Sequence, residues 1–226
     1  MTLVIAHRGA SAHELENSLA AFRAAARMGA DGVELDVHAS ADGTVFVHHD
    51  ETLDGVHAIA RTAASRVREH RLSNGEPVPT LDEVLALLGS LRVYVEVKAL
   101  APQFDERLLA ALDQGPRPAG YAVHAFDHRV IRRLKQRRPN LTCGVLSASY
   151  PVRPLAALTD ANATVLWQEQ RLVDRELVDT VHDGGAVVFA WTVDAAERMR
   201  ELIALDVDAI CTNRPDVGRA VVGAAT

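Results

Sequence analysis

The chain has 226 residues, 48% of them apolar, and its formal net charge at pH 7 is −6. A chain of this length buries a core large enough for one domain without disulfide bonds. The negative net charge argues against a nucleic-acid-binding protein. The densest basic run, 132–138, alternates with Leu134, which favours a solvated helix face over a nucleic-acid patch. No run reaches the roughly 18 apolar residues that a membrane-spanning helix needs.

The start of the chain and the two cysteines indicate where the protein works. Residues 1–9, MTLVIAHRG, lead straight into an apolar run and lack the basic segment of a secretory leader. Cys143 and Cys211 lie in apolar surroundings and form no CxxC pair, so we expect two buried free thiols. Because free thiols are typical of a reducing compartment, we expect a cytoplasmic protein.

Short apolar runs of strand type recur along the whole chain. In chain order they cover residues 3–6, 32–37, 92–97, 121–126, 141–146, 164–168, 186–191 and 207–212. A further run, 44–49, follows the turn signal Ala-Asp-Gly and predicts an extra, hairpin-like segment.

Helical patterns lie between these runs. The first, 16–30, ends at Gly29, and the pattern at 80–89 opens with the Thr-x-x-Glu spacing of a capping box. Three more begin with an aspartate suited to capping a helix N-terminus, at 127–137, 174–185 and 194–206. The Pro-flanked segment 149–154 predicts a loop.

Eight strands with helices between them are the pattern of a (β/α)8 TIM barrel. Residues 50–79 lack a clear barrel period and predict a small insertion after strand two, with one helix at 60–70. No linker or repeat divides the chain, so we expect residues 1–226 to form a single domain. Active sites of such barrels lie at the C-terminal ends of the strands.

Acidic residues stand near the ends of the second and third strands. Glu34, Asp36 and His38 share one strand face because side chains alternate with a period of two. Glu96 and Lys98 repeat the arrangement on the next strand. Neighbouring carboxylates repel one another in a dry barrel unless a hard divalent cation joins them. Glu34, Asp36 and Glu96 therefore indicate a metal site, whereas His38 fits either packing or a part in the site.

The first strand is followed by His7, Arg8 and Gly9. A histidine transfers protons near neutral pH, and a guanidinium offers a fixed fork of donors to a phosphate or carboxylate. By themselves these residues fit a structural role equally well. Asn17 or Ser18 fits the cap of the first helix.

The motifs occur in the order found in the glycerophosphodiester phosphodiesterase family, which the chain resembles. The family has His-Arg-Gly, Pro-Glu-Asn-Thr, Glu-x-Asp and an apolar strand ending in His-Asp; the chain has HRG at 7–9, LENS at 15–18, ELD at 34–36 and VHHD at 47–50. The family's E-I-K, W-T-V-N and T-D-x-P appear as EVK at 96–98, WTVD at 191–194 and TNRP at 212–215. The resemblance covers nearly the whole chain.

The resemblance implies a TIM barrel that hydrolyses a phosphodiester, such as glycerophosphocholine, to glycerol 3-phosphate and an alcohol. It implies a divalent cation, Ca²⁺ or Mg²⁺, held by Glu34, Asp36 and Glu96. It further suggests that the glycerol hydroxyl attacks first, giving a cyclic phosphate that water opens. The expected partner is a small-molecule phosphodiester, without nucleic acid or stable membrane insertion, and the oligomeric state is left open.

The same resemblance places general acid/base catalysis on His7 and His49 and leaves open which of them is the acid. It places Arg8 on the phosphate and Lys98 near the anionic site. His48 precedes His49 on an extended run and should therefore point the other way, to pack or remain partly exposed.

Some positions depart from the family pattern. Leu15 replaces the proline of Pro-Glu-Asn-Thr, and Glu51 and Gly55 replace a proline and an arginine after the His-Asp motif. The latter changes face the substrate opening and bear on the choice of head group. Trp167 and Trp191 fit either core packing or the wall of a substrate pocket, and Trp191 is the one we assign to substrate.

Three other functions use the same barrel. A lysophospholipase D-like enzyme would apply the chemistry to a lipid, but the chain has no long apolar entry segment. A binding barrel without activity should have lost at least one acid/base or metal residue, and none is lost. A metal-dependent aldolase would not obviously need two such histidines.

Overall fold

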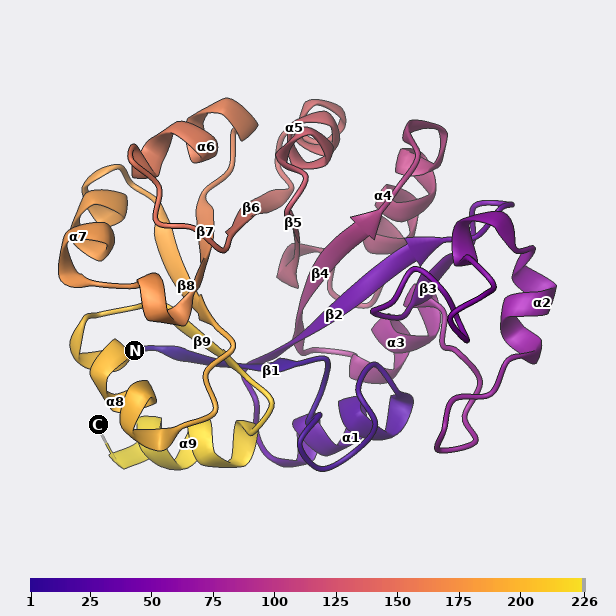
Figure 1. Cartoon of the computed structure of the whole chain (residues 1–226), viewed down its shortest axis with the longest axis horizontal. Helices are drawn as coiled ribbons and strands as arrows, with labels where there is room; N and C mark the ends of the chain where they lie inside the picture. Colours follow the sequence, from indigo (N-terminus) through magenta and orange to yellow (C-terminus); the bar gives the residue numbers. More distant parts are fainter. Residues whose placement is uncertain (225–226) are drawn as a thin grey trace.

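The structure, a computed structural model, describes residues 1–224; the predicted domain, 1–226, includes two residues outside this range. The parallel strands close into a ring because β1 pairs with both β2 and β9 (Figure 1). The predicted TIM barrel is confirmed, and the strand bounds differ from the predicted ones by no more than two residues. The ring contains β1 (Leu3–His7), β2 (Gly32–Ala39), β4 (Arg92–Ala99), β5 (Tyr121–Ala125), β6 (Thr142–Ser147), β7 (Val165–Glu169), β8 (Val187–Trp191) and β9 (Ala209–Thr212).

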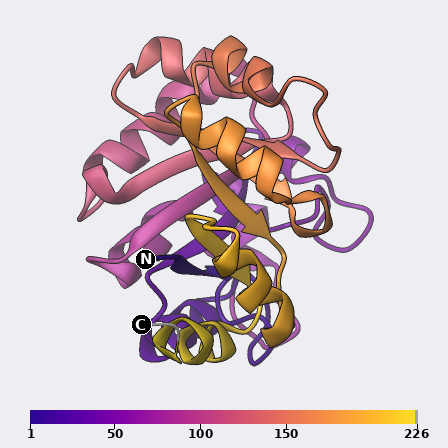
Figure 2. The same ribbon diagram turned by 90° about the vertical axis from the view of Figure 1, so that its left-hand side faces the viewer.

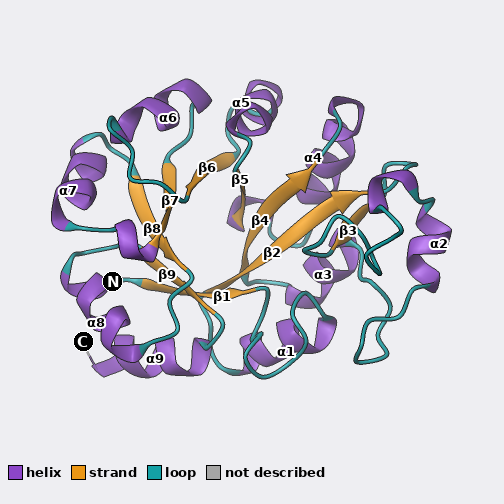
Figure 3. Cartoon of the chain, in the orientation of Figure 1, coloured by secondary structure: helices purple, strands orange, loops and turns teal. Residues whose placement is uncertain are grey.

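Helices lie outside the ring, between successive strands (Figure 3). Seen from the side, the last helix lies next to the first strand, which it contacts (Figure 2). The helices around the barrel are α1 (Leu19–Arg27), α3 (Leu81–Leu88), α4 (Asp105–Gln114), α5 (His128–Arg137), α6 (Pro154–Ala161), α7 (Arg175–Asp183), α8 (Ala196–Ala204) and α9 (Pro215–Ala224).

Helices α4, α6 and α9 have no counterpart among the predicted helices. Neither α4 nor α6 has a side chain that caps its first turn, so both lack the aspartate or Ser/Thr cap found at α1, α3, α5 and α7. Helix α6 begins at Pro154, whose fixed φ and missing N–H suit a first turn. The loop predicted at 149–154 therefore ends one residue earlier than expected.

The capping predictions hold at four helices and fail at one. Ser18, not Asn17, caps α1, Thr80 and Glu83 form the capping box of α3, and aspartates cap α5 and α7. The aspartate predicted to cap α8, Asp194, does not do so, because that helix starts later, after Ala195. Its carboxylate instead accepts hydrogen bonds from the hydroxyl of Thr212, the last residue of β9, and from the N–H of Asn213.

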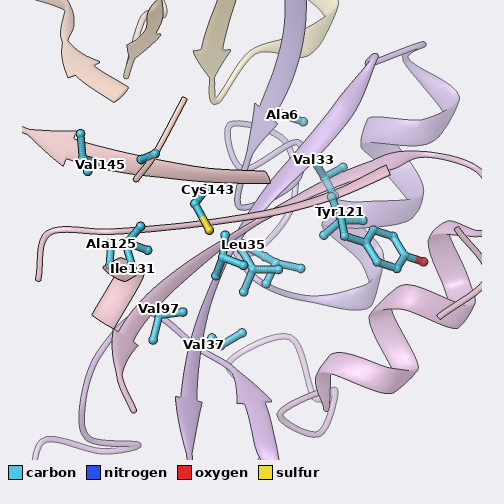
Figure 4. Close-up of a cluster of buried hydrophobic side chains, with 14 of the residues drawn as sticks. Ala6, Val33, Leu35, Val37, Val97, Tyr121, Ala125, Ile131, Cys143 and Val145 are labelled. Atoms are coloured by element: carbon cyan, nitrogen blue, oxygen red, sulfur yellow. The ribbon is translucent and has the colours of Figure 1, made fainter. Parts of the chain in front are cut away.

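Two apolar layers follow from the alternation of side chains along the strands. Val33, Leu35 and Val37 of β2 face outward and pack with the helices, as Figure 4 shows for the outer layer. The inner layer fills the barrel with residues such as Tyr94, Trp167 and Phe189. The β2 side chains that alternate with Val33, Leu35 and Val37 therefore point into the barrel, where polar groups can gather at one end.

The insertion has an apolar cluster of its own. The short strand β3 (Val45–Val47) pairs antiparallel with β2, which confirms the hairpin-like segment. Residues 50–79 follow it and contain α2 (Ala64–Glu69), within the predicted helix. Figure 1 shows this region beside β3, outside the ring. The insertion cluster consists of Phe46, Ile59, Val67 and Val78.

The basic run 132–138 is not simply the solvated helix face that its spacing predicts. Arg133 of α5 forms a paired contact with the buried carboxylate of Asp105 on α4, with Nε–Oδ2 and Nη2–Oδ1 distances of 2.7 and 2.9 Å. Arg138 pairs with Asp113 in a similar way. The run therefore joins two neighbouring helices.

Both cysteines are free and buried, as predicted. Within residues 1–224, no helix has the length and apolar character needed to cross a membrane.

Candidate functional site

A cavity of about 190 Å³ lies at the C-terminal ends of the barrel strands. It contains every predicted site residue except Asp36, which is fully buried next to it. Its polar lining residues are His7, Arg8, Glu34, His49, Glu96, Lys98 and His124. Its apolar lining residues are Phe126, Leu146, Trp167, Trp191 and Cys211.

The three predicted metal carboxylates are buried and close together. Glu34 and Asp36 lie on β2, and Asp36 is paired in register with Glu96 on β4. Burial raises the pKa of Glu34 well above its ordinary value, and the charges of Asp36 and Glu96 raise it further. Burial and Asp36 likewise raise the pKa of Glu96. A bound cation would relieve this conflict between buried negative charges.

Asp36 has two cationic partners, whereas Glu96 has one, Lys98, whose Nζ lies 2.7 Å from Glu96 Oε1. The Asp36 oxygens lie 3.0 Å from Arg8 Nε and 3.1 Å from Lys98 Nζ. Asn17 Nδ2 donates a further hydrogen bond of 2.8 Å, so this residue supports the site instead of capping a helix. Burial alone would raise the pKa of Asp36, but Arg8 and Lys98 outweigh it and hold that pKa below its ordinary value.

The side chains that can share a cation are Glu34, Glu96 and His124, whose ligand atoms all lie within 4.8 Å of one another. Glu34 Oε1 is buried and accepts no hydrogen bond from the part of the chain that the structure describes, and His124 Nε2 lies 3.8 Å from it. These donors fit a divalent cation. His124 is missing from the predicted ligands, although its inward position near the end of a strand is the signal that singled out Glu34 and Glu96.

His124 is held by packing. Its ring stacks on the indole of Trp167, with centroids 4.1 Å apart and an interplanar angle of 9°. Trp167 in turn fits inside the barrel because the neighbouring strand has Gly144, where a Cβ would lie 2.7 Å from the indole. Burial lowers the pKa of His124 to about 3, so its imidazole is neutral at physiological pH.

His7 is connected to a chain of polar side chains behind the cavity. Its Nδ1 lies 2.7 Å from Asn213 Oδ1, and Asn213 Nδ2 donates to Asp194 at 2.7 Å. An amide oxygen only accepts, so His7 donates from Nδ1 and its Nε2 is left for the cavity. Burial, followed by the charge of Arg8, lowers the pKa of His7. Neither Asn213 nor Asp194 is among the predicted site residues.

The backbone turns sharply after His7. Arg8 has a left-handed φ of 55°, and its N–H donates to Glu34 at 3.1 Å. Gly9 follows with a φ of 83°, and a Cβ there would come within 2.7 Å of Ala21 on α1. The turn places the Arg8 guanidinium between Asp36 and Glu16, whose oxygen lies 2.9 Å from Nη1.

The adjacent histidines after β3 have different surroundings. His49 lines the cavity and His48 does not. His49 Nδ1 lies 2.8 Å from Asp50 Oδ1, while His38 Nε2 donates to the backbone oxygen of His49 at 3.0 Å. His38 thus supports the backbone that bears His49. His48 is partly buried, and this burial lowers its pKa.

The two tryptophans occupy different places. Trp167 is 2% exposed and forms part of the barrel core beneath the cavity. Trp191 ends β8 and contacts Phe126 edge to face, with ring centroids 5.6 Å apart. Its indole Nε1 is buried without a hydrogen-bond partner. Trp191 therefore offers an apolar surface to a molecule in the cavity.

Comparison with known proteins agrees with this geometry. The sequence model of the glycerophosphoryl diester phosphodiesterase family matches residues 7–217. A glycerophosphodiester phosphodiesterase of Caldanaerobacter subterraneus is 34% identical over 237 residues, with 95% of each chain covered. A probable glycerophosphodiester phosphodiesterase 2 of Mycobacterium tuberculosis is 30% identical, with 97% of this chain and 90% of the relative covered.

Solved structures show the same fold. An Oleispira antarctica phosphodiesterase in complex with the product sn-glycerol-3-phosphate superposes with a TM-score of 0.92 at 23% identity, covering 99% of this chain and 97% of that one. A glycerophosphodiester phosphodiesterase from Agrobacterium tumefaciens is 26% identical, with a TM-score of 0.86 and coverage of 97% and 100%. The chain therefore belongs to the glycerophosphoryl diester phosphodiesterase family and is a phosphodiesterase of that family.

Proposed function

We propose that the protein hydrolyses glycerophosphodiesters to glycerol 3-phosphate and an alcohol, using a divalent cation and two histidines. The observation that carries the proposal is that His7 and His49 share one cavity with Arg8, Lys98 and the buried carboxylates. The product named for the Oleispira antarctica structure supports the choice of substrate. We propose that residues 1–226 act as one domain on a small-molecule substrate in the cytoplasm.

In this proposal the cation is held by Glu34, Asp36 and Glu96, whose oxygens by themselves favour Ca²⁺ or Mg²⁺. When bound, it supplies positive charge to the phosphoryl oxygens as negative charge develops on them. Arg8 and Lys98 add donors on the same side. Trp191 and Phe126 pack against the carbon skeleton of the substrate.

His7 and His49 act as the acid/base pair. One accepts the proton of the attacking hydroxyl, and the other protonates the leaving alkoxide as the P–O bond breaks. Both have a supporting partner for Nδ1, Asn213 for His7 and Asp50 for His49, which fixes the ring orientation. If the glycerol hydroxyl attacks first and water then opens the cyclic phosphate, His7 and His49 act as acid and base in both steps.

The proposal is tested by hydrolysis of a panel of glycerophosphodiesters, with and without EDTA. His49→Ala should lower kcat/KM by about 10²–10⁴-fold, the usual size of a lost acid or base. His57→Ala, at an exposed histidine of the insertion, is the matched control and should retain full activity. Turnover that survives EDTA, or a fully active His49→Ala variant, would contradict the mechanism. Faster turnover of a lysophospholipid would assign the enzyme to the lipid alternative.

A further inference from the structure

We propose that His124 supplies a nitrogen ligand to the cation, so that the site binds a first-row ion such as Mn²⁺ in preference to Ca²⁺. The inference rests on the proposed function only in taking a divalent cation to be bound in the cavity. It concerns the identity of the ion and its donors, and it adds a residue that the family motifs in this sequence do not contain.

The distances suit a shared ion. Two donors on one ion of this kind, each about 2.0–2.2 Å away, lie roughly 3–4.4 Å apart. His124 Nε2 and Glu34 Oε1 are separated by 3.8 Å, and both belong with Glu96 to one group of donors within 4.8 Å. Glu34 Oε1 is buried and accepts no hydrogen bond, so one of its lone-pair sites needs a partner.

The orientation of His124 is fixed before any ion binds. The Trp167 indole covers one face of the ring, and the side chain is almost fully buried. Within residues 1–224 the buried Nδ1 has no hydrogen-bond partner, so stacking on Trp167 is what holds the ring. A buried, neutral imidazole whose other nitrogen faces an unpartnered carboxylate oxygen has the arrangement of a ligand.

His7 is the competing source of nitrogen, because its Nε2 lies 3.9 Å from Glu34 Oε2. That oxygen already accepts the N–H of Arg8, and His7 itself is bonded to Asn213. His7 also lies outside the group formed by Glu34, Glu96 and His124. Its Nε2 is thus available for proton transfer, while the buried Nδ1 of His124 has no hydrogen-bond partner among residues 1–224.

A nitrogen donor changes which ions the site prefers. Ca²⁺ and Mg²⁺ bind oxygen ligands, whereas an imidazole beside carboxylates strengthens the binding of first-row transition ions. The carboxylates alone would leave the choice among hard ions open. His124 therefore shifts the selectivity of this chain away from Ca²⁺.

The test is the affinity of the purified protein for Mn²⁺ and for Ca²⁺, measured by calorimetric titration without substrate. The wild-type protein should bind Mn²⁺ more tightly. His124→Gln should weaken Mn²⁺ binding by at least about 10-fold, the smallest loss seen when only a partner that supports a ligand is removed, and should alter Ca²⁺ binding far less. His57→Gln is the matched control and should behave as wild type. An unchanged preference in folded His124→Gln would overturn the inference.

A second measurement does not depend on how that variant folds. Pulsed electron paramagnetic resonance of the Mn²⁺-loaded wild-type protein should show couplings to an imidazole nitrogen, and His7→Asn should retain them. Their absence in the wild type, or their loss in His7→Asn, would overturn the assignment to His124. Neither measurement depends on turnover. Nitrogen couplings in a protein that hydrolyses no glycerophosphodiester would contradict the proposed function alone. Ca²⁺-dependent hydrolysis by a protein that shows no nitrogen couplings would contradict this inference alone.

Discussion

At the scale of single residues, two carboxyl groups on one strand have pKa values that are shifted in opposite directions. Glu34 and Asp36 are two positions apart and both buried, yet the pKa of the first is raised and that of the second lowered. The difference comes from their partners, because Asp36 lies against Arg8 and Lys98 whereas Glu34 lies among other acids. Asp36 therefore organises the cationic groups, and Glu34 is the oxygen donor that still needs a cation.

A residue-scale prediction concerns Asp194 and Asn213, which occupy positions where the family pattern has asparagine and aspartate. Exchanging them in Asp194→Asn/Asn213→Asp would place a carboxylate directly on His7 Nδ1. A carboxylate favours the protonated imidazole, so it should raise the pKa of His7. The limb of the kcat/KM pH profile that belongs to His7 should then move to higher pH.

The single variant Asn213→Asp is the companion measurement. It would bring two carboxylates together where Asn213 now donates to Asp194 at 2.7 Å. It should therefore be less stable than the double variant, which retains one donor between the two side chains. If the kcat/KM profiles of the double variant and the wild type coincide over the whole pH range, residue 213 does not control the pKa of His7.

At the scale of secondary-structure elements, the outer helices are joined by polar contacts as well as apolar ones. Asp105 at the start of α4 is completely buried and is bound by Arg133 and Arg137 of α5. Arg133 also donates to the backbone oxygen of Leu100, directly after β4. This contact fixes the segment that follows the strand bearing Glu96 and Lys98.

Removing the Arg133 contact should destabilise the barrel. Arg133→Met leaves Asp105 with Arg137 as its remaining ion-pair partner, and the loss should cost about 1–3 kcal/mol of unfolding free energy. Urea-induced unfolding measures this cost. Arg132→Met, at an exposed position of the same helix, is the control and should change stability by no more than about 0.5 kcal/mol. Equal midpoints for the two variants would show that the α4–α5 contact adds no stability.

At the scale of the whole molecule, the cation site couples metal binding to stability. Because Glu34 keeps its proton to higher pH in the folded chain than in the unfolded chain, the metal-free protein loses stability as pH rises from about 4.5 through the raised pKa. A cation binds the ionised carboxylates and offsets this loss. The lowered pKa of Asp36 acts in the other sense, giving stability that is lost only as pH falls below about 3.8.

Melting curves with EDTA and with the tightest-binding of Mg²⁺, Ca²⁺ and Mn²⁺ check this coupling. An ion at a hundred times its Kd adds about 2.7 kcal/mol, or roughly 5–10 °C for a chain of this size. The difference should be largest near neutral pH and shrink as pH falls toward about 4.5. Glu34→Gln should reduce both the difference and its pH dependence. Identical melting temperatures with EDTA and with the ion would show that the site binds no cation.

The sequence predicts whatever depends on local spacing. The strand runs, the alternation that turns Glu34 and Asp36 inward, and most helix caps are local patterns, and the structure contains them. Helices α4, α6 and α9 lack such signals. Ring closure pairs β9 with β1 and so brings Asn213, just after β9, to His7. The contact of His124 with Glu34 reaches from β5 across β4 to β2, so neither contact could be read from local spacing.

The insertion cluster has a consequence for how such an enzyme changes over time. Phe46, Ile59, Val67 and Val78 pack together apart from the two barrel layers, and the segment joins the barrel through β3 on one side and α3 on the other. Residues 50–79 therefore share an interior with β3, and they also touch α1, where the Leu19 N–H donates to Glu76 at 2.9 Å. Exchanging residues 51–79 would vary what lies beside His49 while keeping Asp50, which supports that histidine, and the cation-binding strands. Selection for a new alcohol group could thus proceed without rebuilding the catalytic centre.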